Sequence, residues 1–404
     1  MFGVKKMLED QGHRVVPFAI NYAENCETPY SRYFASPPIS SDVVLYKDAK
    51  LSAAQKLKLL AKATYNFEAK RKVKQLIREQ KPDIAYALQI VNLLYPSVID
   101  ACYEMGVPVV YRLSDFQLIC PNYKFFRDGR ICEECIHGQH YRGLLHKCLK
   151  GSLTVSGARV FAMYLHRARR MKRKVAAYVT PSKILREKMI EGGFEPAKVF
   201  HVPTFIESSA IRPEFTPGDY ILYVGQVVPF KGVRTLVEAF GLLRRARPMR
   251  LLLAGFSMLD EEEKLKEMVN SRGISGVEFL GFKGGDELAG LYRSARFVVM
   301  PTLWYENIPN VVLEAMAYGK PVVGSDLGGV AEIIDDGRDG LLFEAGSAEA
   351  LKSEMERLIG DDSLVTELGT AARKKMEDEF SVERHYARLS GVLEGARDAL
   401  TAHR

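Results

Sequence analysis

Two carboxylates, Glu306 and Glu314, stand eight positions apart across a predicted junction between a loop and a helix. Residues 297–300 form a short apolar run typical of a strand, and residues 308–318 have the pattern of a helix that Gly319 ends. A carboxylate in the second turn of such a helix can accept hydrogen bonds from ribose hydroxyls, and a carboxylate on the preceding loop can reach sugar hydroxyls. Neither residue has to act as a nucleophile.

The start of this helix offers a second kind of chemistry. The first N–H groups of a helix have no partner within it and carry a partial positive charge, which suits a phosphate or diphosphate. We therefore expect a phosphate-bearing ligand to lie against the turn formed by Asn307, Ile308, Pro309, Asn310 and Val311.

Further motifs stand around this pair in a fixed order. They are Gly225, Lys231-Gly232, Gly281-Phe282, Glu306, Glu314, Gly319-Lys320-Pro321-Val322-Val323, Gly328-Gly329 and Asp336-Gly337-Arg338-Asp339-Gly340. The ordered set resembles the E-x7-E signature of the retaining glycosyltransferases of family four, closely over residues 200–380 and more loosely over the earlier half. The resemblance implies the GT-B fold, in which two Rossmann-like α/β domains face each other across a cleft.

The resemblance also implies roles for the matching residues. Glu306 would contact the donor sugar, and Lys231 would meet the negative charge that grows on the leaving diphosphate. Gly225 and Phe282 would line the donor pocket. The family has an arginine where this chain has Gln226, which keeps hydrogen bonds but lacks the charge, so leaving-group stabilisation would rest more heavily on Lys231 and the helix amides.

The first half departs from the family in two places. Many members carry a His-Asp pair where this chain has Ser114-Asp115, and a hydroxyl can donate one hydrogen bond but cannot carry a proton as an imidazole does. The family also begins with a strand and a Gly-rich loop, whereas residues 1–12 of this chain read as a helix that leads into a strand at 14–19. The sequence therefore indicates a missing N-terminal segment, with an inactive homologue as the alternative.

Strands and helices alternate along the chain, which predicts doubly wound parallel sheets with ligands at the carboxyl ends of their strands. A long polar helix is expected at 52–80. Strands are expected at 83–87, 108–113, 177–180, 199–202, 220–224, 250–254, 277–280, 297–300, 321–325 and 340–343. The predicted domains are an acceptor-side domain (1–203, with a Cys-rich insertion at 120–148), a linker (204–218), a donor domain (219–380) and a helix that crosses back (381–404).

Four of the six cysteines crowd the insertion: Cys120, Cys132, Cys135 and Cys148. A Cys-x2-Cys pair with two further cysteines is compatible with a structural zinc ion in tetrahedral coordination, although the outer spacings are irregular. The alternative is a set of free thiols, since a cytoplasmic setting argues against disulfides.

The charge and hydropathy of the chain limit its expected location and partners in the cell. No run of eighteen apolar residues and no signal peptide is found, so we expect a cytoplasmic protein. The net charge of +7 suggests anionic partners. The basic stretch at 159–174 can form an amphipathic helix on an anionic membrane or a solvated helix. A nucleic-acid partner is not expected, because no recognised binding module is found.

These observations predict a retaining glycosyltransferase that moves a hexose from a UDP- or GDP-sugar to a hydroxyl of a glycan or lipid-linked acceptor, in surface polysaccharide or glycolipid synthesis. No Asp-x-Asp motif is found, so no metal cofactor is expected in catalysis, and cationic side chains must stabilise the diphosphate. Two alternatives stay open: a sugar-nucleotide epimerase of similar fold, and a catalytically inactive nucleotide-sugar binding protein.

Overall fold

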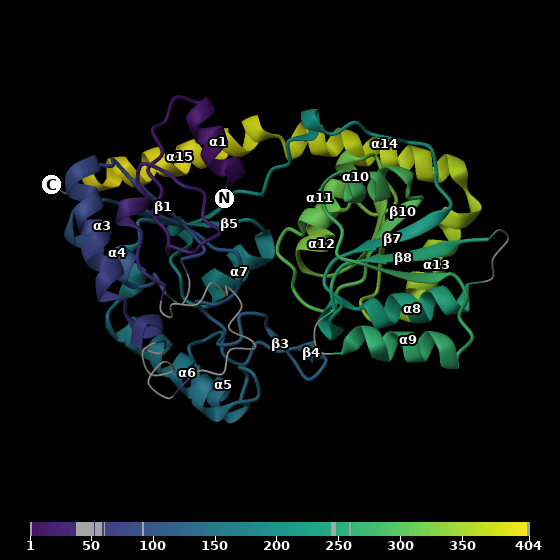
Figure 1. Cartoon of the computed structure of the whole chain (residues 1–404), viewed down its shortest axis with the longest axis horizontal. Coiled ribbons are helices and arrows are strands. Elements are labelled where there is room, and N and C mark those ends of the chain that lie inside the picture. The colour runs from purple at the N-terminus through teal and green to yellow at the C-terminus, as the bar shows by residue number, and fades with distance from the viewer. Residues whose placement is uncertain are drawn as a thin grey trace.

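The structure is a computed structural model that describes residues 2–37, 52, 59, 61–90, 93–243, 248–257 and 260–401. The chain forms two α/β regions side by side, and a long helix runs along the top from the second region to the first (Figure 1). Each region is built on its own parallel sheet. The predicted fold class, an α/β protein with two Rossmann-like domains, is confirmed.

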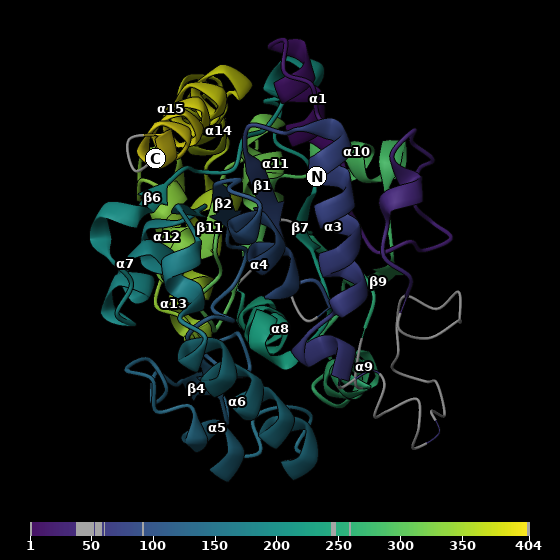
Figure 2. The same ribbon diagram turned by 90° about the vertical axis from the view of Figure 1, so that its left-hand side faces the viewer.

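The first region is built on a parallel sheet in the order β1-β2-β5-β6. Its strands are β1 (Ala85–Leu88), β2 (Val109–Arg112), β5 (Ala177–Thr180) and β6 (Val199–His201). Its helices are α1 (Phe2–Asp10), α3 (Phe67–Gln80), α4 (Ser97–Glu104), α5 (Tyr141–Leu145), α6 (Leu153–Ala168) and α7 (Lys183–Glu191). The insertion holds a short hairpin of β3 (Phe126–Arg127) and β4 (Arg130–Ile131). Helices α5 and α6 lie together at one end of this region, away from the long top helix (Figure 2).

Two expectations for the first region are wrong. Residues 14–19 form no strand, and Ile20 makes only an isolated bridge to Ala35. Pro17 lies in this segment and has no N–H to donate to a sheet ladder. The helix expected at 52–80 is interrupted: residues 59 and 61–64 are helical, and α3 begins at Phe67, because buried Asn66 leaves the helical conformation and its side chain accepts a hydrogen bond from Ala69 N at 3.0 Å. Residues 53–58 and 60 of that prediction lie outside the described part of the chain.

The second region is built on a parallel sheet in the order β12-β11-β10-β7-β8-β9. Its strands are β7 (Tyr220–Val224), β8 (Arg250–Ala254), β9 (Val277–Gly281), β10 (Phe297–Met300), β11 (Val322–Ser325) and β12 (Gly340–Phe343). Its helices are α8 (Val233–Leu242), α9 (Glu261–Ser271), α10 (Gly285–Ser294), α11 (Asn310–Ala317), α12 (Gly328–Ile333), α13 (Ala348–Gly360) and α14 (Asp362–Glu379). Every residue of β10 and β11 is buried, as expected for central parallel strands with helices on both faces.

Helix α15 (Val382–Thr401) follows α14 and returns to the first region (Figure 1). Its side chains Leu389 and Val392 pack against Val110 and Val179 of the first sheet. The described residues include no helix that is long and apolar enough to span a bilayer.

Candidate active site

The carboxyl ends of β7, β10 and β11 bring the central motif residues together. Glu306 lies on the loop after β10, is only 7% exposed, and forms an ion pair with Lys231 Nζ. Trp304 Nε1 donates a hydrogen bond to the same carboxylate at 2.6 Å. Lys231 reaches it from the short helical turn Pro229–Lys231 that follows β7. The chain thus holds a buried anion and a cation in contact at the edge of the second sheet.

Glycines allow the loops at this edge to approach one another closely. A Cβ added to Gly232 would lie 1.7 Å from the carbonyl oxygen of Pro301, and one added to Gly329 would lie 1.4 Å from that of Asn307. Gly329 N also donates to Glu306 O at 2.8 Å. The Gly-Gly turn therefore fixes the backbone that carries Glu306, which is a role in positioning rather than in contact with a ligand.

Glu314 lies in α11, which begins after Pro309 without a side-chain cap and so leaves its first amides open to a ligand. Buried Tyr292 donates its hydroxyl to Glu314 Oε2 at 2.9 Å. Burial raises the pKa of Glu314, and the Tyr292 hydrogen bond works in the opposite direction. Among the described residues, Oε1 of Glu314 has no hydrogen-bond partner, so a ligand hydroxyl can use it.

The other predicted donor residues lie at the same edge of the sheet but differ in position. Gly225 follows β7 with φ of +150°, and its amide donates to Ala254 O at 2.9 Å. The carbonyl of Gln226 accepts from the hydroxyl of Tyr223 at 2.8 Å. Phe282 follows the outer strand β9, three strands from β10, and its ring is 74% exposed. The structure therefore brings Lys231 and Glu306 together and leaves Phe282 apart.

Residues of the turn before α11 contact the first region. Asn307 Nδ2 donates to the carbonyl of Ser114 at 2.6 Å, and Asn307 Oδ1 accepts from Ser182 Oγ at 2.9 Å. The Ser114 hydroxyl accepts a hydrogen bond from Arg112 at 3.2 Å. The Asn307 side chain is thus engaged by protein groups, and only its backbone is open to a ligand. Ser114 lies in the first region, in contact with the loop that carries Glu306.

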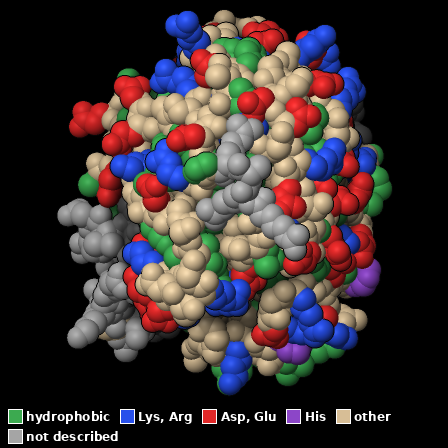
Figure 3. All heavy atoms as spheres, turned by 90° about the vertical axis from the view of Figure 1, so that its right-hand side faces the viewer, with side chains coloured by type: hydrophobic (Ala, Val, Ile, Leu, Met, Phe, Trp, Pro, Cys, Tyr) green, Lys and Arg blue, Asp and Glu red, His purple; other side chains and the backbone are tan. Residues whose placement is uncertain are grey.

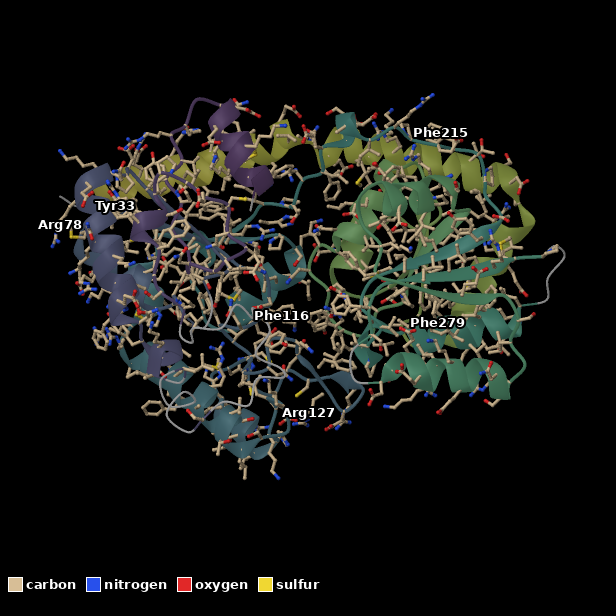
Figure 4. The ribbon with its side chains drawn as sticks, viewed as in Figure 1. Tyr33, Arg78, Phe116, Arg127, Phe215 and Phe279 are labelled. Atoms are coloured by element: carbon tan, nitrogen blue, oxygen red, sulfur yellow. The ribbon has the colours of Figure 1, made fainter. Side chains whose placement is uncertain are left out.

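Aromatic rings extend this contact between the two regions. Phe116 lies on the side of the first region that faces the second (Figure 4), with its ring centroid 6.2 Å from that of Tyr305. The hairpin of the insertion also reaches across, since Lys124 Nζ lies 3.9 Å from the ring centroid of Phe230 and Phe126 lies 6.4 Å from it. The two regions therefore meet directly beside the Lys231 turn.

Three residues of this site did not stand out in the sequence: Trp304, Tyr292 and Glu332. The Glu332 carboxylate accepts from the amides of Lys183 and Ile184, each at 2.6 Å, at the start of α7 in the first region. Trp304 could have been identified from the sequence, because it is the single tryptophan of the chain and lies two positions before Glu306. No sequence pattern marks Tyr292 or Glu332, because their partners are distant in the sequence.

The cysteines do not form the predicted zinc site. Among the described residues, which include all four cysteines of the insertion, no three His, Cys, Asp or Glu side chains are placed to hold a metal ion. Burial raises the pKa of the Cys120 thiol to about 11 and, together with the neighbouring cysteines, that of Cys135 to about 12. Cys120 Sγ instead donates to Asn122 Oδ1 at 3.0 Å, while Cys132 and Cys148 are half-buried free thiols.

The second region matches a known family. Residues 218–361 match the family model Glycosyl transferases group 1. The chain is 33% identical over 186 residues to an uncharacterized glycosyltransferase of Methanocaldococcus jannaschii, covering 46% of this chain and 51% of that protein. It is 32% identical over 167 residues to the O-antigen chain mannosyltransferase B of Escherichia coli, covering 41% and 42%. The chain thus spans about half the length of the curated relatives it matches.

Solved structures resemble the chain over a longer stretch. The sucrose-phosphate synthase of Thermosynechococcus elongatus has a TM-score of 0.67 at 16% identity and covers 98% of this chain and 93% of its own. HepE of Anabaena, solved in complex with UDP and glucose, has a TM-score of 0.61 at 17% identity and covers 80% and 81%. At these identities the likeness establishes the fold, which is GT-B.

Proposed function

We propose that this chain transfers a hexose-type sugar, with retention of anomeric configuration, from a nucleotide-sugar donor to a hydroxyl of a glycan or lipid-linked acceptor. The observation that carries the proposal is the buried Glu306 carboxylate, held by Lys231 and Trp304, one loop before the uncapped start of α11. The two-domain fold and the group 1 match of residues 218–361 support the same class of reaction.

From the contacts at this edge, we infer separate tasks for the two glutamates. The open amides at the start of α11 and the ammonium of Lys231 suit a diphosphate, whose charge grows as the bond to the sugar breaks. The free oxygen of Glu314 suits a ribose hydroxyl. Glu306 is already bound by a cation and an indole N–H, so it suits hydrogen bonding and orientation of the donor sugar rather than nucleophilic attack.

We place the donor among the UDP- and GDP-hexoses. HepE of Anabaena, which shares the fold, was solved in complex with UDP and glucose. The Escherichia coli relative is an O-antigen chain mannosyltransferase, which supports a role in assembling a surface polysaccharide or glycolipid.

A cytoplasmic protein with contact to an anionic membrane surface fits the end of the first region that holds α5 and α6. Leu145 and Phe161 there are 67% and 65% exposed, and Arg169, Arg170 and Arg173 follow α6 with exposed side chains. The outer face of the second region differs, because acidic and basic side chains are interspersed over it (Figure 3). Co-sedimentation with phosphatidylglycerol vesicles tests this contact, and a Leu145→Ser, Phe161→Ser variant should bind more weakly.

Calorimetric titration tests the donor site. UDP, GDP, ADP and their hexose derivatives are titrated into the wild-type chain, a Glu314→Ala variant and a Glu349→Ala control, whose carboxylate is 71% exposed and pairs with Lys352. We expect one nucleotide to bind the wild type and the control equally and the Glu314→Ala variant about tenfold more weakly, as for one or two lost hydrogen bonds to a charged group. Equal affinity of the nucleotide for all three proteins would mean that the donor binds at another place in the chain.

Turnover separates the proposed reaction from its rivals. A transferase consumes the bound nucleotide sugar only when an acceptor is present, and NMR of the product reads the anomeric configuration. Conversion of the donor without an acceptor would identify an epimerase. Binding without any turnover would identify a nucleotide-sugar binding protein, which is the outcome that Gln226 and Ser114 would explain.

A further inference from the structure

A cavity with a volume of about 450 Å³ lies outside the donor site, within the first region. It is enclosed by α6, the turn Met171–Lys174, the end of α7 and the loop that precedes α5. Its volume lies in the range of small-molecule sites. The polar side chains that matter most are Gln117, His140, Arg159, His166, Arg167 and Lys172.

Positive charge prevails in the lining. Arg159 donates to the carbonyl of Gln117 at 2.6 Å, and its charge is offset in part by Asp115, which is not part of the lining. Lys172 Nζ donates to the carbonyl of Gly192 at 2.9 Å and lies 3.7 Å from the ring centroid of Phe194. Both contacts hold a cation in place without neutralising it.

The remaining charged groups leave this excess uncompensated. Within the described chain, the Arg167 guanidinium has no hydrogen-bond or ion-pair partner and points against Gly138, where an added Cβ would lie 2.5 Å from Nη1. The lining contains one carboxylate, Glu191, and that group is already paired with Lys188 at 3.0 Å. Three cations therefore face the cavity against one anion that is engaged elsewhere.

His140 supplies an independent sign of an unfilled site. The residue is only 6% exposed, and its Nδ1 is buried without a hydrogen-bond partner. Burial, together with the charges of Arg167, Arg159 and Lys172, lowers the pKa of His140 to about 4, so the imidazole is neutral near pH 7 and can donate one hydrogen bond. A buried polar atom without a partner is energetically unfavourable, and a ligand acceptor would relieve that cost.

We propose that this cavity binds the anionic group, a phosphate or a carboxylate, of a small ligand, with Arg159, Arg167 and Lys172 as its cations and His140 as a further donor. The site is separate from the edge of the second sheet and does not depend on the proposed transfer reaction.

The test titrates inorganic phosphate, and in a separate arm glucuronate, into four proteins followed by calorimetry. They are the wild type, an Arg167→Gln, Lys172→Gln double variant, an Arg173→Gln control and a Lys231→Ala control. Arg173 belongs to the same turn as Lys172 but does not line the cavity, so its substitution controls for the loss of one positive charge from that turn. The Lys231→Ala variant disables the other place where phosphate would bind.

We expect at least one anion to bind the wild type and both controls with similar affinity, and the double variant about tenfold more weakly. The arm that binds identifies the class of anion. In NMR titrations, the bound anion should also raise the pKa of His140 from about 4. Equal affinity in the double variant, loss of binding in Lys231→Ala, or no binding of either anion at millimolar concentration would overturn the proposal. Circular dichroism of the double variant checks that it is folded.

Discussion

The two regions that meet beside Glu306 are built in different ways. In the second region, Glu306, Lys231 and Trp304 lie on short connections that follow the central strands β7 and β10. In the first region, Ser114 and the insertion belong to long loops that contact the second region. Segments anchored to rigid elements hold their geometry more tightly than long loops do. The site residues of the second region are therefore expected to be positioned more firmly than those of the first.

Buried ionisable groups show the same division. Burial raises the pKa values of Glu314, Glu332 and Asp339 in the second region. In the first region and on α15, burial lowers the pKa values of four histidines to about 4: His140, His166, His201 and His385. Residues 219–380 contain no histidine. As the pH falls, these histidines therefore destabilise the first region, whereas these carboxylates favour the folded second region.

The largest expected effect comes from Lys231 in the second region. Lys231→Ala should lower the rate of the proposed sugar transfer about 10²- to 10³-fold, because the cation that we propose to meet the leaving diphosphate is lost. The control is Lys283→Ala, which removes a lysine whose partner is the exposed Glu287 at 3.5 Å. Since the substitution also leaves buried Glu306 unpaired, thermal unfolding is measured beside the kinetics. A rate unchanged by Lys231→Ala would contradict the assignment.

Acid should weaken the first region before the second. A histidine whose folded pKa is lowered from 6.5 to about 4 contributes stability above pH 6.5 that is lost as the pH falls toward 4, with a ceiling of about 3 kcal/mol per imidazole. The carboxylates with raised pKa values act oppositely, because they contribute stability at low pH and lose it as the pH rises. Hydrogen exchange is measured at pH 7 and pH 5. The protection of the first region against exchange should be lower at pH 5 than at pH 7.

Substitution of single histidines sharpens this test. His140→Gln and His385→Gln should each flatten the loss of stability between pH 6.5 and pH 4, because glutamine does not titrate. The control is His13→Gln, which replaces an exposed histidine. Faster exchange in the second region, or an unchanged pH profile in the two buried variants, would count against the comparison.

The same division explains how much the sequence could predict. Strands β7, β8 and β10 begin and end where their apolar runs do, because a parallel strand buried on both faces leaves a continuous signal. Residues 14–19 have a similar apolar character, yet they find no partner strand in the described chain. Pairing of that kind depends on tertiary context, which a local pattern does not contain.

The residues of the candidate site also differ in how well the sequence predicts them. The spacing of Glu306, Glu314 and Lys231 in the sequence is enough to indicate their chemistry, since each stands at the end of a predictable element. Tyr292 contacts Glu314 across 22 positions of sequence, and Glu332 contacts the amides of the first region across 148 and 149 positions. Contacts at such separations follow from the packing of the whole domain and leave no local signal.

A smaller effect is expected from the Gly-Gly turn that supports Glu306. Gly329→Ala should destabilise the chain by about 1–3 kcal/mol, because the new Cβ would lie 1.4 Å from the carbonyl oxygen of Asn307 and the backbone must shift. Gly360→Ala is the matched control, since its Cβ would meet nothing within 4 Å. Chemical denaturation compares the two variants. Equal stability would mean that the loop is not held as tightly as the structure indicates.

The smallest effect concerns the contact that joins the two regions. Glu332→Gln keeps one oxygen acceptor for the amides of Lys183 and Ile184 but removes the charge that stabilises the start of α7, at a cost of about 0.3–1 kcal/mol. These two amides should then exchange severalfold faster, while overall unfolding changes little. Glu349→Gln, an exposed helix-start carboxylate whose loss affects only α13, is the control. If exchange at Lys183 and Ile184 is unchanged, the charge does not couple α12 to α7, and the contact between the regions must depend instead on Asn307 and the aromatic rings beside it.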